Sequence, residues 1–412
     1  MTVTRRSFLR TGLGAAALAS IGGSAGASTP TAVAAPPALA CVLLYLHGGA
    51  SQFETFDPKP GRSTGGPTTA IDTRVPGLRF AAALPQLAAR ADRLTLLRTV
   101  TSKEGNHDRA RYLMHTGHAP QGGVAHPSLG ALVSALHPDA PLVGAVTIGP
   151  PVPGPGLLGP RHAALPIRDP GRPIRNLQAP AGVDARRSAA RADMLATLQQ
   201  QFAQGRAHEL VDAHGEVMAR ARALAAAPDK RAFDLSSEPA GTRARYGDGR
   251  FGSGCLLARR LLDADVPFVE VGLGGWDTHE DGFSRTDALG RELDTGMSAL
   301  LDDLAASGRL QQTLVVCMGD FGRTPVINGR EGRDHHPQCA NVVLAGAGLR
   351  AAVVGETDAD GRNIAERPIA IESVFRTLAQ CLGIDADEVR MAPSGRPITT
   401  FEPADPIAEI LA

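Results

Sequence analysis

The amino-acid sequence predicts an α/β domain built around parallel strands, and three observations support this prediction. Short, continuous apolar runs such as residues 41–46 have the length and composition of buried strands. A segment with helical periodicity separates two such runs within residues 268–318. Polar, glycine-rich loops follow the predicted strands, at the positions where α/β proteins bind ligands. A chain of 412 residues is long enough for one large domain or two smaller ones.

The first part of this domain alternates strand-like and helix-like segments. Apolar runs at 41–46, 94–97 and 143–148 have strand length and are bounded by turn residues. A helix is expected from Asp108 to about residue 115, where a threonine and a glycine stop it. A second helix is expected to follow Ser128.

The middle of the chain reads as an insert over residues 149–230. Prolines and glycines dominate residues 149–180, which predicts a long ordered loop or a lid. Apolar residues then recur with helical periodicity over 184–227.

The strand–helix–strand unit gives the clearest information on topology. Strands are expected at 268–272 and 313–318, with a helix over 289–304 that ends before Gly308. Such crossovers are right-handed in about 98% of cases and join parallel strands. The carboxyl ends of both strands should therefore lie at one edge of the sheet.

The N-terminus resembles a twin-arginine export signal. Arg5 and Arg6 precede a mild apolar run at 11–21, and the small residues 25–27 offer a cleavage site. The alternative is a disordered N-terminus that contains two arginines by chance. The apolar run is too short and too rich in glycine for a stable membrane span.

This interpretation divides the chain into a signal peptide (1–27), a linker (28–40) and a single domain (41–412). It predicts the twin-arginine translocase as a partner, and a periplasmic or extracellular location for the mature protein.

Charge and cysteine content exclude some classes of function. The sequence has 42 basic and 42 acidic residues, and cleavage after Ala27 would remove three arginines, leaving 39 against 42, a net charge of −3. No basic surface for nucleic acid is expected. The five cysteines lack metal-type spacing and lie in apolar runs, so they are expected to be buried thiols.

Carboxylates and imidazoles follow the predicted strand ends. Asp277 and His279 follow the first strand of the crossover, Asp320 follows the second, and His335 lies shortly before the next apolar run. These side chains are typical ligands of zinc, manganese and related ions. The alternative is that they are loop residues that form turns and caps.

A further polar cluster opens the helix that begins near Asp108. His107 lies at this helix N-terminus, where anions are favoured, and is a candidate ligand, base or nucleophile, or else a cap. Arg109 and Arg323 are candidates for binding a phosphate or sulfate group in a bidentate manner, or for pairing with nearby acids.

Five motifs together resemble the bacterial family known as domain of unknown function 1501, whose members commonly carry twin-arginine signals. They are 48–60 (GGASQFETFDPKP), 103–112 (KEGNHDRARY), 274–279 (GGWDTH), 318–325 (MGDFGRTP) and 332–335 (GRDH). The resemblance extends from about residue 41 to the end of the chain.

That family is similar in fold to the alkaline phosphatase and sulfatase superfamily. The resemblance implies a three-layer sandwich: a mostly parallel central sheet with helices on both faces, plus a helical insert. It also implies hydrolysis of phosphate or sulfate esters by one or two metal ions and a nucleophile at a helix N-terminus.

Matched by position, the resemblance makes Asp277, His279 and His335 metal ligands. Asp320 occupies a position where the superfamily has Asp-His, but Phe321 follows it here. His107 occupies the position of the nucleophile. The first strand ends in His47, where the superfamily normally has a metal-binding aspartate.

The first functional hypothesis is an exported, metal-dependent hydrolase of a small anionic ester. Its ion would be zinc, manganese or calcium, held by Asp277, His279, Asp320 and His335. His107 would act as base or covalent acceptor, with Arg109 and Arg323 on the anion. The alternative is a non-catalytic exported binding or surface protein. A redox enzyme ranks last, because the sequence lacks a dinucleotide glycine fingerprint and iron–sulfur cysteine spacing.

Overall fold

The computed structural model describes residues 37–174, 177, 182–204 and 208–411. The predicted signal peptide and most of the predicted linker therefore lie outside the described residues. Within these ranges, nine strands form one central sheet, in which β15 pairs with β4. In spatial order, the others are β12 (Ala352–Val354), β4 (Thr95–Thr101), β11 (Ala340–Gly346), β8 (Thr313–Gly319), β1 (Ala40–Leu46), β7 (Phe268–Leu273), β5 (Val146–Ile148) and β6 (Leu165–Ile167); β15 spans Ile369–Ala370.

The central sheet is mixed but mostly parallel, as the sequence predicts. β1 lies between β7 and β8 and is parallel to both. β11 is the exception, because it pairs antiparallel with both β8 and β4. The remaining pairs in the sheet are parallel.

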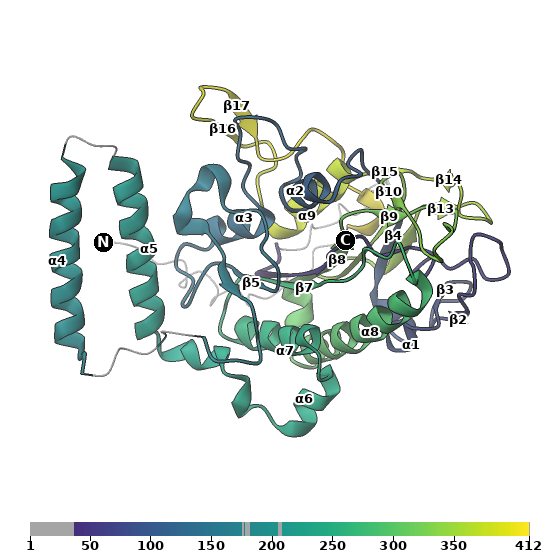
Figure 1. Cartoon of the computed structure of the whole chain (residues 1–412), viewed down its shortest axis with the longest axis horizontal. Helices are drawn as coiled ribbons and strands as arrows, with labels where there is room; N and C mark the ends of the chain where they lie inside the picture. The colour runs from purple at the N-terminus through teal and green to yellow at the C-terminus, as the bar shows by residue number, and fades with distance from the viewer. Residues whose placement is uncertain (1–36, 175–176, 178–181, 205–207, 412) are drawn as a thin grey trace, which may run out of the picture. The chain divides into compact units, whose positions relative to one another are not determined.

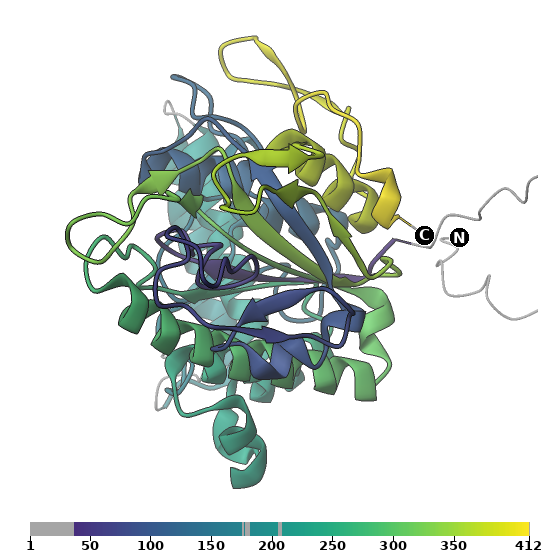
Figure 2. The same ribbon diagram turned by 90° about the vertical axis from the view of Figure 1, so that its right-hand side faces the viewer.

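Helices cover both faces of the sheet (Figure 1). α7 (Arg250–Asp263) and α8 (Gly282–Ala306) pack on one face, together with the short α1 (Pro85–Ala88). α2 (His107–Thr116), α3 (Leu129–Leu136) and α9 (Ile371–Leu382) pack on the other. Figure 2 shows these layers after a quarter turn. The three-layer α/β architecture predicted from the sequence is confirmed.

The alternation of side chains along β1 explains why the domain has two cores. Val42, Leu44 and Leu46 point into the core beneath α7 and α8. Cys41, Leu43 and Tyr45 point into the core beneath α2, α3 and α9. A strand that is buried on both faces has to be apolar throughout, which is the pattern seen in residues 41–46.

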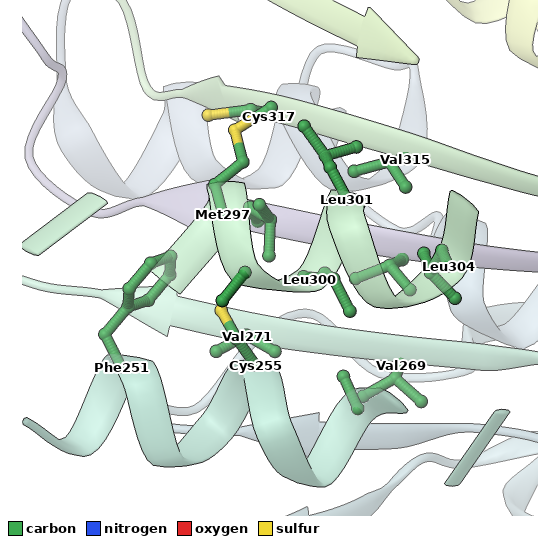
Figure 3. Packing of buried hydrophobic residues seen from close by; sticks show 14 of the residues in the cluster. Phe251, Cys255, Val269, Val271, Met297, Leu300, Leu301, Leu304, Val315 and Cys317 are labelled. Atoms are coloured by element: carbon green, nitrogen blue, oxygen red, sulfur yellow. The ribbon is translucent and has the colours of Figure 1, made fainter. Parts of the chain in front are cut away.

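The helical periodicity seen in the sequence corresponds to the buried face of α8. Met297, Leu300, Leu301 and Leu304 belong to the same buried core as Val315 and Cys317 of β8 and the side chains of α7 (Figure 3). α8 begins at Gly282, seven residues before the predicted start. The periodicity did not reveal its first turns because they carry few apolar residues.

The insert contains an antiparallel helix pair. α4 (Ala185–Ala203) packs against α5 (His208–Ala226). α5 also contacts the segment around residue 160, where Arg220 donates hydrogen bonds to the carbonyls of Pro160 and Ala163.

The smaller elements are α6 (Ala240–Tyr246) and four two-stranded ribbons. These ribbons are β2 (Ala70–Asp72) with β3 (Arg79–Ala81), β9 (Gly322–Arg323) with β10 (His335–His336), β13 (Glu356–Thr357) with β14 (Ile364–Glu366), and β16 (Val389–Met391) with β17 (Pro397–Thr399). Across the described residues, no helix combines the length and apolarity needed to cross a bilayer. All five cysteines are free and buried in the described structure, as predicted.

A buried histidine makes stability depend on pH. Burial, with a further contribution from the nearby His118, whose ring stacks on it, lowers the pKa of His126 to about 4. In the unfolded chain this pKa returns to about 6.5. Protonation therefore favours unfolding, and stability should fall as pH decreases from about 6.5 towards 4, by at most about 3 kcal/mol.

Urea unfolding of wild type and His126→Gln at pH 7 and pH 4.5 measures this effect. The variant should lose clearly less stability on acidification than the wild type does. An equal loss in both proteins would show that His126 makes no such contribution.

Candidate metal centre

The topology brings four chain segments together at one edge of the sheet. Asp277 follows the carboxyl end of β7, and Asp320 follows that of β8. α2 begins with His107 after the carboxyl end of β4, which points the same way. Because β11 runs antiparallel, its amino end lies at this edge, and His335 shortly precedes it.

Three of these side chains are placed to share one ion. His107, Asp277 and His335 offer ligand atoms that all lie within 4.8 Å of one another. Asp277 Oδ1 is 3.3 Å from Nε2 of both His107 and His335. His279 Nε2 lies 3.1 Å from the same oxygen and 2.9 Å from His335 Nε2. Ligands of a tetrahedral zinc ion with bonds near 2.0–2.1 Å are themselves about 3.3 Å apart.

The Nδ1 atom of each of the three imidazoles is hydrogen-bonded to a protein oxygen on the side away from the centre. The partners of the three Nδ1 atoms are Asp320 Oδ2 for His107 (2.7 Å), Asp334 Oδ1 for His279 (2.9 Å) and the Gly105 carbonyl for His335 (2.8 Å). Such contacts orient histidine ligands in metal sites. His107 Nε2 is buried and has no hydrogen-bond partner among the described residues. A buried, unpartnered nitrogen beside a carboxylate fits a metal ligand.

Asp320 lies behind His107 rather than beside Asp277. Its buried carboxylate accepts hydrogen bonds from the Tyr45 hydroxyl (2.5 Å), the Gly48 amide (3.1 Å) and His107. Burial alone would raise its pKa, but the bonds from His107 and Tyr45 lower it below the usual value, so Asp320 is ionised. The geometry gives Asp320 the position of a residue that orients His107. A direct role in binding the metal, as predicted from sequence for Asp320, stays a prediction.

Arg323 is fully buried beneath the centre. Its guanidinium donates to the carbonyls of Gly48, Gly49, Trp276 and Arg333, and to Asp277 Oδ1 at 2.7 Å. Although burial opposes ionisation, Arg323, together with His107 and His279, lowers the pKa of Asp277 to about 2. Each of its three guanidinium nitrogens thus already donates to the protein. Binding of a substrate anion by Arg323, as predicted from sequence, would require these bonds to break.

Arg109 lies on the first turn of α2 and is half exposed. Its guanidinium makes a bidentate pair with Glu104, at 2.6 and 2.7 Å. Its role in holding an anion stays a prediction. Trp276 is fully buried in the core.

One family model matches almost the whole described chain. It is described as "Protein of unknown function (DUF1501)" and matches residues 38–411. The chain belongs to this family. No match was found among curated proteins.

Three solved structures are similar to this DUF1501 protein at 12% identity each. Ps i-CgsB in complex with k-i-k-neocarrahexaose has a TM-score of 0.42, over 85% of this chain and 72% of that one. The PsFucS1 sulfatase from Pseudoalteromonas sp. has a TM-score of 0.40, over 85% and 68%. Alkaline phosphatase from the Antarctic bacterium TAB5 has a TM-score of 0.38, over 85% and 100%. All three TM-scores are below 0.5, and the function proposed below therefore rests on the residues of the chain itself.

Sequence reasoning did not find Tyr45 and Asp334, two residues that support the centre of this DUF1501 protein. Asp334 immediately precedes His335, and its closeness to His279 depends on the ribbon formed by β9 and β10. For Tyr45, the sequence does contain an indication of its role. A phenol inside a buried apolar strand needs a hydrogen-bond partner, and only a polar group from another segment could supply it.

Proposed function

We propose that this protein is an exported, metal-dependent hydrolase of phosphate, sulfate or related esters. The observation that carries the proposal is the convergence of His107, Asp277 and His335, with His279 alongside, at the carboxyl edge of a mostly parallel sheet. Open α/β sheets bind their ligands at this edge. The three ligand side chains are half-buried or exposed, so a substrate can reach them.

The donor set indicates which ions fit. Imidazole nitrogens and a single carboxylate suit zinc or manganese, whereas calcium prefers oxygen ligands throughout. A bound ion of this type would supply Lewis acidity and lower the pKa of a coordinated water. Asp320, Asp334 and the Gly105 carbonyl would keep the three imidazoles in the tautomer that presents Nε2.

The start of α2 adds an attraction for anions. The helix dipole places partial positive charge near His107, which favours a phosphate or sulfate group there. The amides of Asp108 and Arg109 already bond to the side chain of Asn106, which caps the helix. The dipole therefore contributes long-range attraction, and a specific anion contact has to come from a side chain.

Export forms part of this proposal and rests on the signal-like residues 4–27. Replacing Arg5 and Arg6 by lysine should retain the protein in the cytoplasm with its N-terminal segment uncleaved. Cell fractionation and N-terminal sequencing of wild type and variant measure this. Equal export of both proteins would exclude the twin-arginine route.

Metal removal tests the central claim. Protein purified without chelator should contain a divalent ion by elemental analysis. Its melting temperature should fall on chelation and recover when zinc or manganese is added, because an ion that binds the folded state stabilises it. Aryl phosphates and aryl sulfates should be hydrolysed only by the metal-loaded form.

Two results would contradict the proposal in different ways. If no ion is bound and added metals leave the melting temperature unchanged, there is no metal centre. If an ion is bound but a broad ester panel shows no turnover, the protein is the non-catalytic binding protein considered as the alternative.

A further inference from the structure

The arginines around the candidate centre differ in how many of their donors are already used. Every guanidinium nitrogen of Arg323 donates to a carbonyl or to Asp277, and Arg109 is paired with Glu104. Arg111 is different. Its Nε is buried and finds no hydrogen-bond partner in the part of the chain that the structure describes. Its closest carboxylate is Asp108 Oδ1, at 3.5 Å, and that side chain is 91% exposed.

The geometry of α2 directs Arg111 towards the centre. Arg111 lies four residues after His107 on the same helix, so both side chains lie on one face. Side chains on a helix lean towards its N-terminus, which here is the end that carries His107. The positive charge of Arg111 also helps to lower the pKa of Asp320, after the stronger contributions of His107 and Tyr45. Arg111 is therefore close to the residues directly behind the centre.

A cavity of about 290 Å³ is lined on α2 by Asp108, Arg111 and Tyr112. Arg111 and Tyr112 form one wall, and the proline-rich segment 151–154 forms another. His126 also lines it, and its Nδ1 lies 2.9 Å from the Tyr112 hydroxyl oxygen. A lining that combines a cationic side chain with apolar residues suits an ester whose charged end is linked to an apolar alcohol.

A second unpartnered nitrogen lies near the same region. His47 is largely buried, and its Nε2 has no partner among the described side chains and backbone. This nitrogen faces the backbone of Gly272, next to Pro150, which precedes the proline-rich wall. Unsatisfied buried polar atoms are rare in proteins and require an explanation.

We propose that Arg111 binds the phosphate or sulfate group of the substrate, and that the adjoining cavity receives its organic part. The guanidinium fork would exchange its weak contact with Asp108 for a bidentate contact with the oxyanion. The carboxylate of Asp108 is free to turn into solvent. This inference rests on the proposed function and names its substrate class: monoesters whose alcohol is small enough for the cavity.

Direct anion binding tests this assignment without requiring turnover. Inorganic phosphate and inorganic sulfate are titrated separately, by calorimetry, into metal-loaded wild type, Arg111→Gln, Arg111→Lys and Arg291→Gln. Arg291 is an exposed arginine of α8 paired with Asp287, and serves as the matched control. Metal content and melting temperature are recorded for every variant.

Arg111→Gln should weaken binding of the preferred anion about 10- to 100-fold at unchanged metal content, the effect of losing hydrogen bonds to a charged group. Arg111→Lys should bind with intermediate affinity, since it keeps the charge and loses the fork. Arg291→Gln should bind like wild type. The anion that responds more strongly to Arg111 identifies the ester as a phosphate or a sulfate.

An unchanged affinity for the anion in Arg111→Gln would overturn the assignment. So would a result in which Arg109→Gln weakens anion binding and Arg111→Gln does not. Failure of the assignment and failure of the proposed function are distinguishable. Turnover with an unchanged KM in Arg111→Gln overturns the role of Arg111 and leaves the hydrolase standing. Arg111-dependent anion binding without ester turnover supports the anion site and overturns the hydrolase.

Discussion

Replacing Asp277 by asparagine should abolish tight metal binding and lower ester turnover by at least about a hundredfold. Asp277 Oδ1 is the common neighbour of the candidate histidine ligands and lies 3.1–3.3 Å from three imidazole nitrogens. Asparagine keeps the size of the side chain but removes the charge that attracts a cation. Elemental analysis of the purified variant and its kcat/KM on the best ester are the measurements.

Two further variants make this result specific. Asp287→Asn removes an exposed carboxylate of α8 and should change neither metal content nor turnover. Asp320→Asn removes the residue behind His107 and should weaken metal binding about 10- to 100-fold, less than loss of a direct ligand. A variant at Asp277 that is folded, metal-loaded and active would exclude the centre described above.

Replacing Glu54 by alanine should have the largest effect on stability, about 3–5 kcal/mol. Glu54 and Arg333 form a buried ion pair, with contacts of 2.8–3.1 Å, and both side chains are almost inaccessible to solvent. Arg333 also donates to the carbonyls of Thr64, Thr324 and Pro325. Truncation of Glu54 leaves a buried guanidinium without its counter-charge.

Urea unfolding of Glu54→Ala and Glu280→Ala, measured side by side, separates the effect of losing a buried ion pair from that of losing an exposed one. Glu280 pairs with Arg330 at the surface, where both side chains are more than half exposed. Loss of an exposed pair should cost no more than about 1 kcal/mol. Equal effects of the two substitutions would show that the buried pair makes no special contribution.

The fold was largely predictable because its signals are local. The apolar runs that became β1, β7 and β8, and the periodic segment that became α8, are each complete within a short stretch of sequence. The crossover rule then fixes the relative direction of two of these strands, and with it the shared edge that carries Asp277 and Asp320.

The details of the centre were less predictable because they depend on tertiary contacts. Nothing near His335 in sequence indicates that β11 runs antiparallel, yet this direction brings His335 to the shared edge. The positions of Asp320 behind His107 and of Arg323 beneath the loops likewise depend on partners more than two hundred residues away. Residue type indicated the chemistry, but the order of the residues around the centre required the structure.

The buried position of Arg323 has a consequence for how an ion would enter. Its guanidinium joins carbonyls from the segments that follow β1 and β7 to one that precedes β10. None of these segments can shift alone without leaving a hydrogen bond unmade in a place that water does not reach. The scaffold is therefore preorganised: most of the conformational entropy of assembling the ligands is lost during folding, before any ion arrives.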